Sequence, residues 1–260
     1  MNKGNKIGYG LIGYPLSHSW SANYFREKFE REKISDRDYQ LFPMQDLTLF
    51  HSFLSDHPEL CGLNVTIPFK EKIIQYLDEI DQQAAEIGAV NTIRIYRKNG
   101  KQFTKGFNTD ADGFIQSADF SRISHAYILG TGGASKAVAY ALRESGIPVT
   151  LVSRNPVKDG SISYDDFVSV KTGIPVLIVN ATPLGMFPET STFPQVNYDH
   201  LRPGDFLYDL VYNPAETLFL EKGKEKGTRI QNGLKMLYLQ AELSYVIWNN
   251  DFCAPWSRGF

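Results

Sequence analysis

The sequence predicts an α/β protein with two domains, and three observations support this interpretation. Short apolar runs alternate with helical patterns along the chain, which is typical of α/β folds. A glycine-rich turn at residues 130–135 joins a predicted strand to a predicted helix. Over a hundred residues precede this turn, which is enough for a separate small domain.

The first half of the chain is a series of short predicted strands and helices. Tyr24, Phe25 and Phe29 recur at helical spacing, so the segment around them is predicted to be a helix. Asn99-Gly100 favours a type I′ turn between two strands. In chain order, we predict strand 7–12, helix 21–33, strand 39–42, helix 47–55, strand 63–67, helices 70–77 and 82–87, and strands 92–96 and 102–107.

The second half begins with a strand, a turn and a helix in the order of a βαβ unit. The predicted elements are strand 127–129, helix 136–145, strands 149–152, 176–180 and 206–210, and helix 234–248. Segment 155–173 is short for a full crossover, so we expect a loop in place of one helix. The last helix lies beyond this half, so we expect it to return to the first domain. The predicted divisions are therefore 1–105, 106–233 and the returning segment 234–260.

The composition excludes several classes of protein. With 42% hydrophobic and 22% charged residues, the chain is typical of a globular protein. A net charge of −2 gives no reason to expect a nucleic-acid or membrane partner. Cys61 and Cys253 are the only cysteines, so we expect no disulfide framework and a cytoplasmic location. The histidines lack ligand spacing, so we expect no metal site.

The glycine-rich turn is predicted to bind a dinucleotide. Its glycines let the backbone approach a pyrophosphate, and the first N–H groups of the following helix face the anion. An NAD site usually has Asp or Glu at the end of the next strand, where it binds the ribose hydroxyls. This chain has Arg154 there, which can stack on adenine and pair with a 2′-phosphate or else be a solvated loop charge, and Lys158 adds positive charge nearby. The sequence therefore favours NADP over NAD.

Two groups of polar residues in the first half are candidates for binding a polar ligand. Ser19 and Ser21 follow the first strand, where either can instead cap the next helix. Asn64 and Thr66 alternate with apolar residues, so they share one face of a strand. That face is either a ligand site or an exposed edge.

Lys70 and Asp110 are candidates for proton transfer. Lys70 opens a predicted helix, where a cation is unfavourable, so another group is expected to justify its position. Asp110 is the natural counter-charge if the two loops converge, and otherwise both are solvated surface charges. A lysine held by a carboxylate can donate a proton to an oxygen that gains negative charge when a carbonyl is reduced.

Eight groups of residues carry a family resemblance. They are 13–15 with 18–21, 64–70, 88–92, 108–110, 130–135, 180–186, 208–209 with Tyr212, and 236–237 with Gln240. Together and in this order they resemble the shikimate dehydrogenase family, and the match covers nearly the whole chain.

The resemblance implies an N-terminal α/β substrate domain and a Rossmann-type NADP-binding domain. It also implies reversible, NADP-linked reduction of 3-dehydroshikimate to shikimate, in the pathway to aromatic amino acids. Lys70 would donate the proton in reduction, with Asp110 orienting it and binding a substrate hydroxyl. The implied substrate-binding residues are Ser19, Ser21, Asn64, Thr66, Asn91, Tyr212 and Gln240. The implied cofactor-binding residues are Gly130, Thr131, Gly132, Gly133, Ala134, Ser153, Arg154, Lys158, Ala181, Thr182 and Gly233.

Two alternatives stay open. A quinate/shikimate dehydrogenase that uses NAD would have the same fold, although Arg154 argues against it. A non-catalytic NADP-binding sensor on this fold predicts loss of Lys70 or Asp110, and both are present. In each case the expected partners are small molecules, and the chain is expected to be a monomer or a homodimer.

Overall fold

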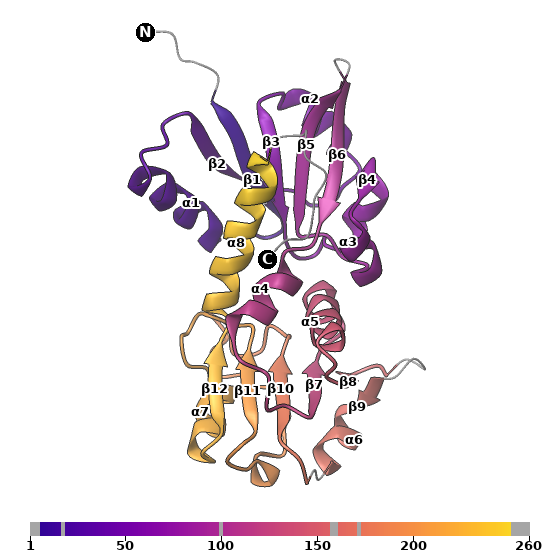
Figure 1. Ribbon diagram of the computed structural model, residues 1–260, viewed down its shortest axis with the longest axis vertical. Coiled ribbons are helices and arrows are strands. Elements are labelled where there is room, and N and C mark those ends of the chain that lie inside the picture. Colours follow the sequence, from indigo (N-terminus) through magenta and orange to yellow (C-terminus); the bar gives the residue numbers. More distant parts are fainter. Residues whose placement is uncertain (1–5, 17–18, 99–100, 157–160, 171–172, 251–260) are drawn as a thin grey trace. The chain divides into compact units, whose positions relative to one another are not determined.

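The computed structural model describes residues 6–16, 19–98, 101–156, 161–170 and 173–250. The chain forms two compact units (Figure 1). Unit 1 contains residues 1–81, 90–107 and 241–260, and unit 2 contains residues 82–89 and 108–240. The α/β fold class predicted from the sequence is confirmed. Segment 82–89 lies inside the predicted first domain, but its contacts place it in unit 2.

Unit 1 is built around a six-stranded sheet with the order β2-β1-β3-β5-β6-β4. The first three strands are parallel, and β5 is antiparallel to both of its neighbours. The strands are β1 Ile7–Gly13, β2 Arg37–Pro43, β3 Leu60–Val65, β4 Glu79–Ile80, β5 Thr92–Lys98 and β6 Lys101–Phe107. The helices are α1 Trp20–Arg31, α2 Phe50–Asp56, the 3₁₀ helix η1 Lys72–Tyr76 and the last part of α8 Leu234–Asn249.

An aromatic core covers one face of this sheet. The rings of Tyr9 and Trp248 stack with their centroids 4.7 Å apart, and Phe25 of α1 stacks on Tyr39 at 4.5 Å. Such pairs contribute about 0.5–1.5 kcal/mol beyond the burial of their area. A Cβ atom on Gly62 would lie 2.2 Å from Trp248, so glycine is required for this close approach. The end of α8 therefore packs in unit 1, whereas residues 234–240 at its start belong to unit 2.

Unit 2 contains a six-stranded sheet with the order β12-β11-β10-β7-β8-β9, and all of its pairs are parallel. The strands are β7 His125–Leu129, β8 Val149–Ser153, β9 Ser161–Ser163, β10 Val176–Asn180, β11 Phe206–Asp209 and β12 Arg229–Asn232. The helices are α3 Gln82–Ile87, α4 Asp110–Ser117, α5 Gly133–Glu144, α6 Tyr164–Ser169, α7 Leu218–Glu225, the 3₁₀ helix η2 Tyr198–His200 and the start of α8.

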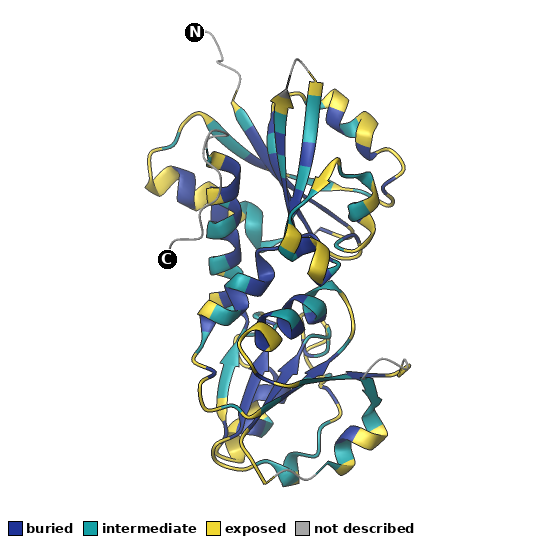
Figure 2. Ribbon diagram, turned by 45° about the vertical axis from the view of Figure 1, so that its right-hand side comes forward, coloured by how far each residue is buried: buried dark blue, intermediate teal, exposed yellow. Residues whose placement is uncertain are grey.

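Helices cover both faces of the second sheet. Leu177 and Val179 of β10 pack in the cluster that contains α4 and α5, whereas Val176 and Ile178 pack in the cluster that contains α6 and α7. Figure 2 shows most of this sheet as buried. The strand order changes direction between β7 and β10, and ligands of such sheets bind at the carboxyl ends of the strands at this switch point.

Several local predictions differ from the structure. Residues 70–77 form a turn and the short helix η1 instead of an α-helix. The prediction of a loop in place of a helix within 155–173 is wrong, because strand β9 and helix α6 form there. A capping box of Ser163 and Asp166 stabilises the N-terminus of α6. Helices α4 and α7 have no predicted counterpart. The Asn99-Gly100 turn lies outside the described residues.

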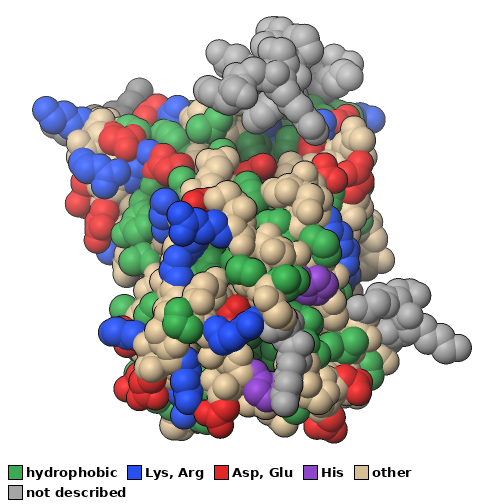
Figure 3. Space-filling model, turned by 60° about the horizontal axis from the view of Figure 1, so that its bottom comes forward, with side chains coloured by type: hydrophobic (Ala, Val, Ile, Leu, Met, Phe, Trp, Pro, Cys, Tyr) green, Lys and Arg blue, Asp and Glu red, His purple; other side chains and the backbone are tan. Residues whose placement is uncertain are grey.

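The surface carries charges of both signs. The face shown in Figure 3 carries both Lys and Arg side chains and Asp and Glu side chains. This agrees with the net charge of −2. Within the described ranges, no helix combines the length and the apolar character needed to cross a membrane.

Candidate active site

The predicted substrate residues of unit 1 lie at the carboxyl ends of its parallel strands. Asn64 is the last residue but one of β3, and Thr66 follows the strand directly. Ser19 and Ser21 lie where the chain leaves β1 and enters α1. Ser19 occupies the N-cap position of α1, yet its side chain makes no capping hydrogen bond. Helix capping therefore does not account for this hydroxyl.

Backbone hydrogen bonds hold Lys70 beside these strand ends. Val65 N in β3 donates to Asn91 O at 2.8 Å, and Val90 N donates to Lys70 O at 2.7 Å. The turn that carries Lys70 and the segment that carries Asn91 are therefore fixed to each other and to β3. Within unit 1 the structure brings Lys70, Asn64 and Asn91 together.

The side chain of Asn64 is hydrogen-bonded at both ends of its amide. Its Oδ1 accepts from the Tyr39 hydroxyl at 2.9 Å, and its Nδ2 donates to Ser244 Oγ at 2.9 Å. The Tyr39 hydroxyl also hydrogen-bonds to Ser21, and burial raises the pKa of Tyr39 far above its ordinary value. Tyr39 and Ser244 are not among the predicted residues. Their partners are distant in sequence, so no local pattern identifies them.

Asp110 is the first residue of α4 in unit 2. It is 5% exposed, and Asn108 Oδ1 accepts hydrogen bonds from Asp110 N at 3.1 Å and from Ala111 N at 3.2 Å. A carboxylate at a helix N-terminus interacts favourably with the helix dipole. Lys70 and Asp110 belong to different units.

Gln240 and Tyr212 are also in unit 2. The Thr109 hydroxyl donates to Gln240 O at 3.0 Å, so Gln240 lies beside the start of α4. The side chain of Gln240 donates to Leu237 O at 2.9 Å. Burial raises the pKa of the Tyr212 hydroxyl, which is therefore a neutral donor at physiological pH.

The glycine-rich turn follows β7 and ends at the N-terminus of α5. Gly130 has φ +112°, and a Cβ atom there would lie 3.3 Å from Ala181 O, Thr182 Cγ2 and Ser135 Oγ. Gly132 is the N-cap residue of α5, and no heavy atom lies within 4 Å of its hypothetical Cβ. Thr131 lies between these two glycines, and Gly133 and Ala134 are the first residues of α5. Gly130 is therefore crowded, whereas Gly132 is open.

Ser135, in the first turn of helix α5, has a polar atom without an explained role. The residue is 1% exposed, and its Oγ has no hydrogen-bond partner in the described part of the chain. Buried polar atoms nearly always have a partner. An open helix N-terminus with a spare hydroxyl fits the phosphates of a dinucleotide.

The end of β8 carries the residues expected to distinguish NADP from NAD. Ser153 Oγ accepts from Asn155 N at 3.1 Å and so shapes the turn that follows, while Arg154 is exposed. Lys158 lies outside the described residues. Gly233 precedes α8, and a Cβ atom there would lie 2.2 Å from Leu210 O. Glycine is therefore required at this position for packing.

A buried carboxylate, to which the sequence motifs assign no catalytic or binding role, lies near the switch point. Asp209 is not exposed, and it accepts hydrogen bonds from Asn180 Nδ2 at 2.9 Å, Val211 N at 3.0 Å and Thr217 Oγ1 at 2.6 Å. Burial raises its pKa to about 6. Asn180 Oδ1 in turn accepts from Thr182 N at 3.1 Å. Asp209 therefore stabilises the loop that contains Ala181 and Thr182.

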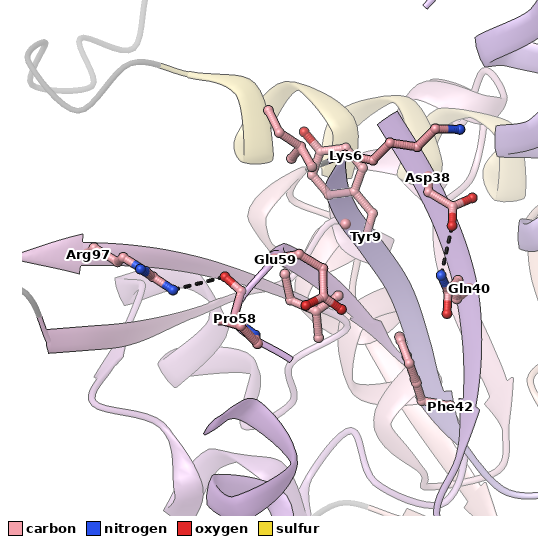
Figure 4. A pocket seen from close by; sticks show the side chains of 11 residues that line it. Lys6, Tyr9, Asp38, Gln40, Phe42, Pro58, Glu59 and Arg97 are labelled. Carbon is pink, nitrogen blue, oxygen red and sulfur yellow. Dashed lines mark hydrogen bonds between the residues drawn. The ribbon is translucent and has the colours of Figure 1, made fainter. Parts of the chain in front are cut away.

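Two other features of the described residues bear on the choice of site. No group of three His, Cys, Asp or Glu side chains among them could hold a metal ion. A cavity of about 650 Å³ in unit 1 is lined by Lys6, Asp38, Gln40 and Arg97 among others (Figure 4). It lies at the amino ends of β1 and β2, and its described lining residues include none of the predicted site residues.

Comparisons with known proteins agree with this geometry. Residues 11–93 match the family described as shikimate dehydrogenase substrate binding domain. A shikimate dehydrogenase (NADP(+)) from Staphylococcus aureus strain MRSA252 is 37% identical, with 93% of this chain and 92% of that protein covered. A second one, from Caldanaerobacter subterraneus subsp. tengcongensis, is 33% identical, with 94% and 92% covered.

A solved structure agrees as well. It is the shikimate 5-dehydrogenase from Thermus thermophilus in complex with NADP(H) and shikimate. The TM-score is 0.79 at 30% identity, and the match covers 94% of this chain and 93% of that one. The likeness therefore extends over both units, and the chain belongs to the shikimate dehydrogenase family.

Proposed function

We propose that this chain is an NADP-dependent shikimate dehydrogenase that interconverts 3-dehydroshikimate and shikimate. One observation carries the proposal: the backbone hydrogen bonds from Val65 to Asn91 and from Val90 to Lys70 hold a lysine beside Asn64 and Asn91 at the carboxyl end of β3. Membership of the family supports the same reaction.

The substrate carboxylate is assigned to Ser19 and Ser21. Their hydroxyls can donate to an anion, and the Ser19 side chain is not used for capping. The ring hydroxyls are assigned to Asn64, Thr66, Asn91, Tyr212 and Gln240, whose amides and hydroxyls can both donate and accept.

Lys70 is the proposed proton donor in reduction. As the carbonyl carbon gains a hydride, its oxygen becomes negative and takes a proton from the Lys70 ammonium, which leaves a hydroxyl and a neutral amine. The amine regains a proton from solvent, and in oxidation it accepts the hydroxyl proton. Asp110 is the proposed carboxylate that orients Lys70 and binds a substrate hydroxyl.

NADPH supplies the hydride when it is bound. The pyrophosphate is assigned to the turn from Gly130 to Ala134, with the N–H groups of α5 and Ser135 Oγ as donors. The 2′-phosphate is assigned to Arg154 and Lys158. The remaining cofactor contacts are assigned to Ser153, Ala181, Thr182 and Gly233.

The compartment and the assembly are part of this proposal. Cys61 is a free thiol, which fits the reducing cytoplasm. We expect a monomer or a homodimer, which light scattering of the purified chain distinguishes.

The direct test follows the absorbance of the reduced nicotinamide while the enzyme oxidises shikimate. Four reactions are run side by side, with shikimate or quinate as substrate and NADP or NAD as cofactor. The proposal predicts the highest kcat/KM for shikimate with NADP. A preference for quinate with NAD would instead identify a quinate dehydrogenase. If no pair of substrate and cofactor were turned over, the chain would be a non-catalytic NADP-binding protein.

A further inference from the structure

A continuous series of side-chain hydrogen bonds in unit 1 joins Ser21 to Asn91. It passes through Tyr39, Asn64, Ser244 and Thr92. The Ser244 and Thr92 hydroxyl oxygens are 2.7 Å apart, and Thr92 Oγ1 donates to Asn91 Oδ1 at 3.2 Å. The two ends of the series are proposed substrate residues, whereas Tyr39, Ser244 and Thr92 are not.

This series is buried from Tyr39 to Asn91. Thr92 and Ser244 are 0% exposed, and Asn91 is 3% exposed. A buried polar group that loses its partner costs about 1–3 kcal/mol. The hydrogen-bond partners therefore restrict how each amide and hydroxyl can point.

One assignment of protons satisfies the contacts described between Tyr39 and Asn91. Tyr39 is a neutral phenol because burial raises its pKa, and it donates to Asn64 Oδ1. The other end of that amide, Nδ2, then donates to Ser244 Oγ. In this assignment Ser244 accepts there and donates to Thr92, and Thr92 donates to Asn91 Oδ1.

The assignment has a consequence for the Asn91 amide. Because Oδ1 accepts from Thr92, the amide is held with Nδ2 at its other end, and Nδ2 can only donate. A substrate hydroxyl that meets this group must accept. The hydroxyl pair of Ser244 and Thr92 thus determines whether Asn91 is a donor or an acceptor.

We propose that Thr92 and Ser244 are positioning residues that fix the side-chain amide of Asn91 as a hydrogen-bond donor to the substrate. This rests on the proposed function, in which Asn91 binds a substrate hydroxyl. It extends the site to Ser244 on α8, far from Thr92 in sequence but adjacent to it within unit 1.

The test compares Thr92→Val with Thr104→Val. Both are buried threonines of neighbouring strands in unit 1, and Thr104 donates to Asp78 Oδ2 at 2.8 Å, outside the series. Thr92→Val should raise the KM for shikimate about three- to tenfold, the usual effect of one lost hydrogen bond. The kcat and the KM for NADP should change less than about twofold. Thr104→Val should leave all three values unchanged.

A double-mutant cycle separates positioning from general loss of stability. If Thr92 acts through Asn91, then Thr92→Val adds little to the KM of Asn91→Ala. Ser244→Ala should act in the same direction as Thr92→Val. Equal effects of Thr92→Val and Thr104→Val, or a full extra effect in the Asn91→Ala background, would overturn the proposal.

A second readout does not depend on the reaction. The Asn91 side-chain amide signals of the ligand-free protein, assigned with Asn91→Asp, should shift or broaden in Thr92→Val and stay in place in Thr104→Val. Unchanged signals in both variants contradict the positioning role. If the wild-type protein does not oxidise shikimate, the proposed function fails, while this spectrum still decides the role of Thr92.

Discussion

Asn180 Nδ2 donates a hydrogen bond of 2.9 Å to Asp209 Oδ1, and neither residue is exposed to solvent. The two residues are paired in register on the neighbouring parallel strands β10 and β11. Thr217 donates to the other carboxylate oxygen at 2.6 Å. One buried carboxylate therefore connects the ends of two strands to the N-terminus of α7.

The first prediction concerns the pH dependence of this carboxylate. Burial raises the pKa of Asp209 from 3.8 to about 6 in the folded protein. Below pH about 4 both states are protonated. Between pH about 4 and 6 Asp209 is ionised in the unfolded chain but still protonated in the folded protein, so the free energy of unfolding falls as the pH rises. Above that range the buried, ionised Asp209 lowers the free energy of unfolding by about 3 kcal/mol in full.

Asp209→Asn removes this titration. The free energy of unfolding of the variant, minus that of the wild type, should increase by about 3 kcal/mol between pH 3 and pH 7. Urea unfolding at several pH values measures the difference. Thr217→Val serves as the companion variant, because losing a donor raises the Asp209 pKa further and steepens the dependence. A difference that stays constant with pH would contradict the assignment.

The second prediction concerns proton transfer by Lys70. Lys70→Ala should lower kcat by about 10²-fold or more, the usual contribution of a positioned acid or base, with a smaller change in KM. Lys72→Ala is the matched control, because Lys72 is an exposed lysine two residues further along the chain. Steady-state kinetics with shikimate and NADP measure both variants. Equal losses in the two variants would remove Lys70 from the mechanism.

The relation of Lys70 to Asp110 needs its own variants. Asp110→Asn should also lower kcat, and the double variant should lose little more than Lys70→Ala alone if the two side chains act as a unit. Losses that multiply would show that they act independently. Asp112→Asn, a change in the same first turn of α4, is the control.

The fold follows from local patterns to a large extent, because each pattern depends on residues close in sequence. The strand before Gly130, the helix after it and the strand that ends at Ser153 are recognisable from apolar runs and glycine spacing. Helix α6 is not, because Phe167 is the single buried residue among its six, so no apolar period marks the helix. A short helix is stabilised mainly by its caps and by packing, which periodicity does not record.

The candidate site divides in the same way. The sequence suggests Asn64 and Lys70 as site residues because they are polar residues among apolar ones. The hydrogen-bond partners of Asn64, however, depend on the tertiary fold. Ser244 approaches Asn64 because α8 packs against the sheet of unit 1. The Asn180 and Asp209 pair becomes predictable only once β10 and β11 are known to be neighbours in register.

The third prediction concerns the choice of cofactor. If Arg154 pairs with the 2′-phosphate, Arg154→Ala should raise the KM for NADP about ten- to a hundredfold, because hydrogen bonds to charged groups are worth about 1.5–3 kcal/mol. The KM for NAD should not change. Arg143→Ala is the matched control, since Arg143 is an exposed arginine in the last turn of α5. Parallel increases for both cofactors would place Arg154 outside phosphate recognition.

The last prediction uses the two different glycines of the turn. Gly130 has a positive φ and close neighbours, so Gly130→Ala should destabilise the ligand-free protein by about 1–3 kcal/mol. Gly132 has φ −79° and open space around its hypothetical Cβ. Gly132→Ala should therefore leave the unfolding free energy unchanged or raise it by up to about 1 kcal/mol.

Cofactor binding should respond to both changes, but for different reasons. The open space at Gly132 is where the backbone is expected to approach the pyrophosphate, so a methyl group there should weaken NADP binding without weakening the fold. Urea unfolding without ligand and NADPH fluorescence titration measure the two quantities separately. Normal NADPH affinity in Gly132→Ala would mean that the pyrophosphate does not contact this part of the turn. Weakened affinity in a variant of full stability identifies a contact with the cofactor, because a fold defect would lower both quantities together.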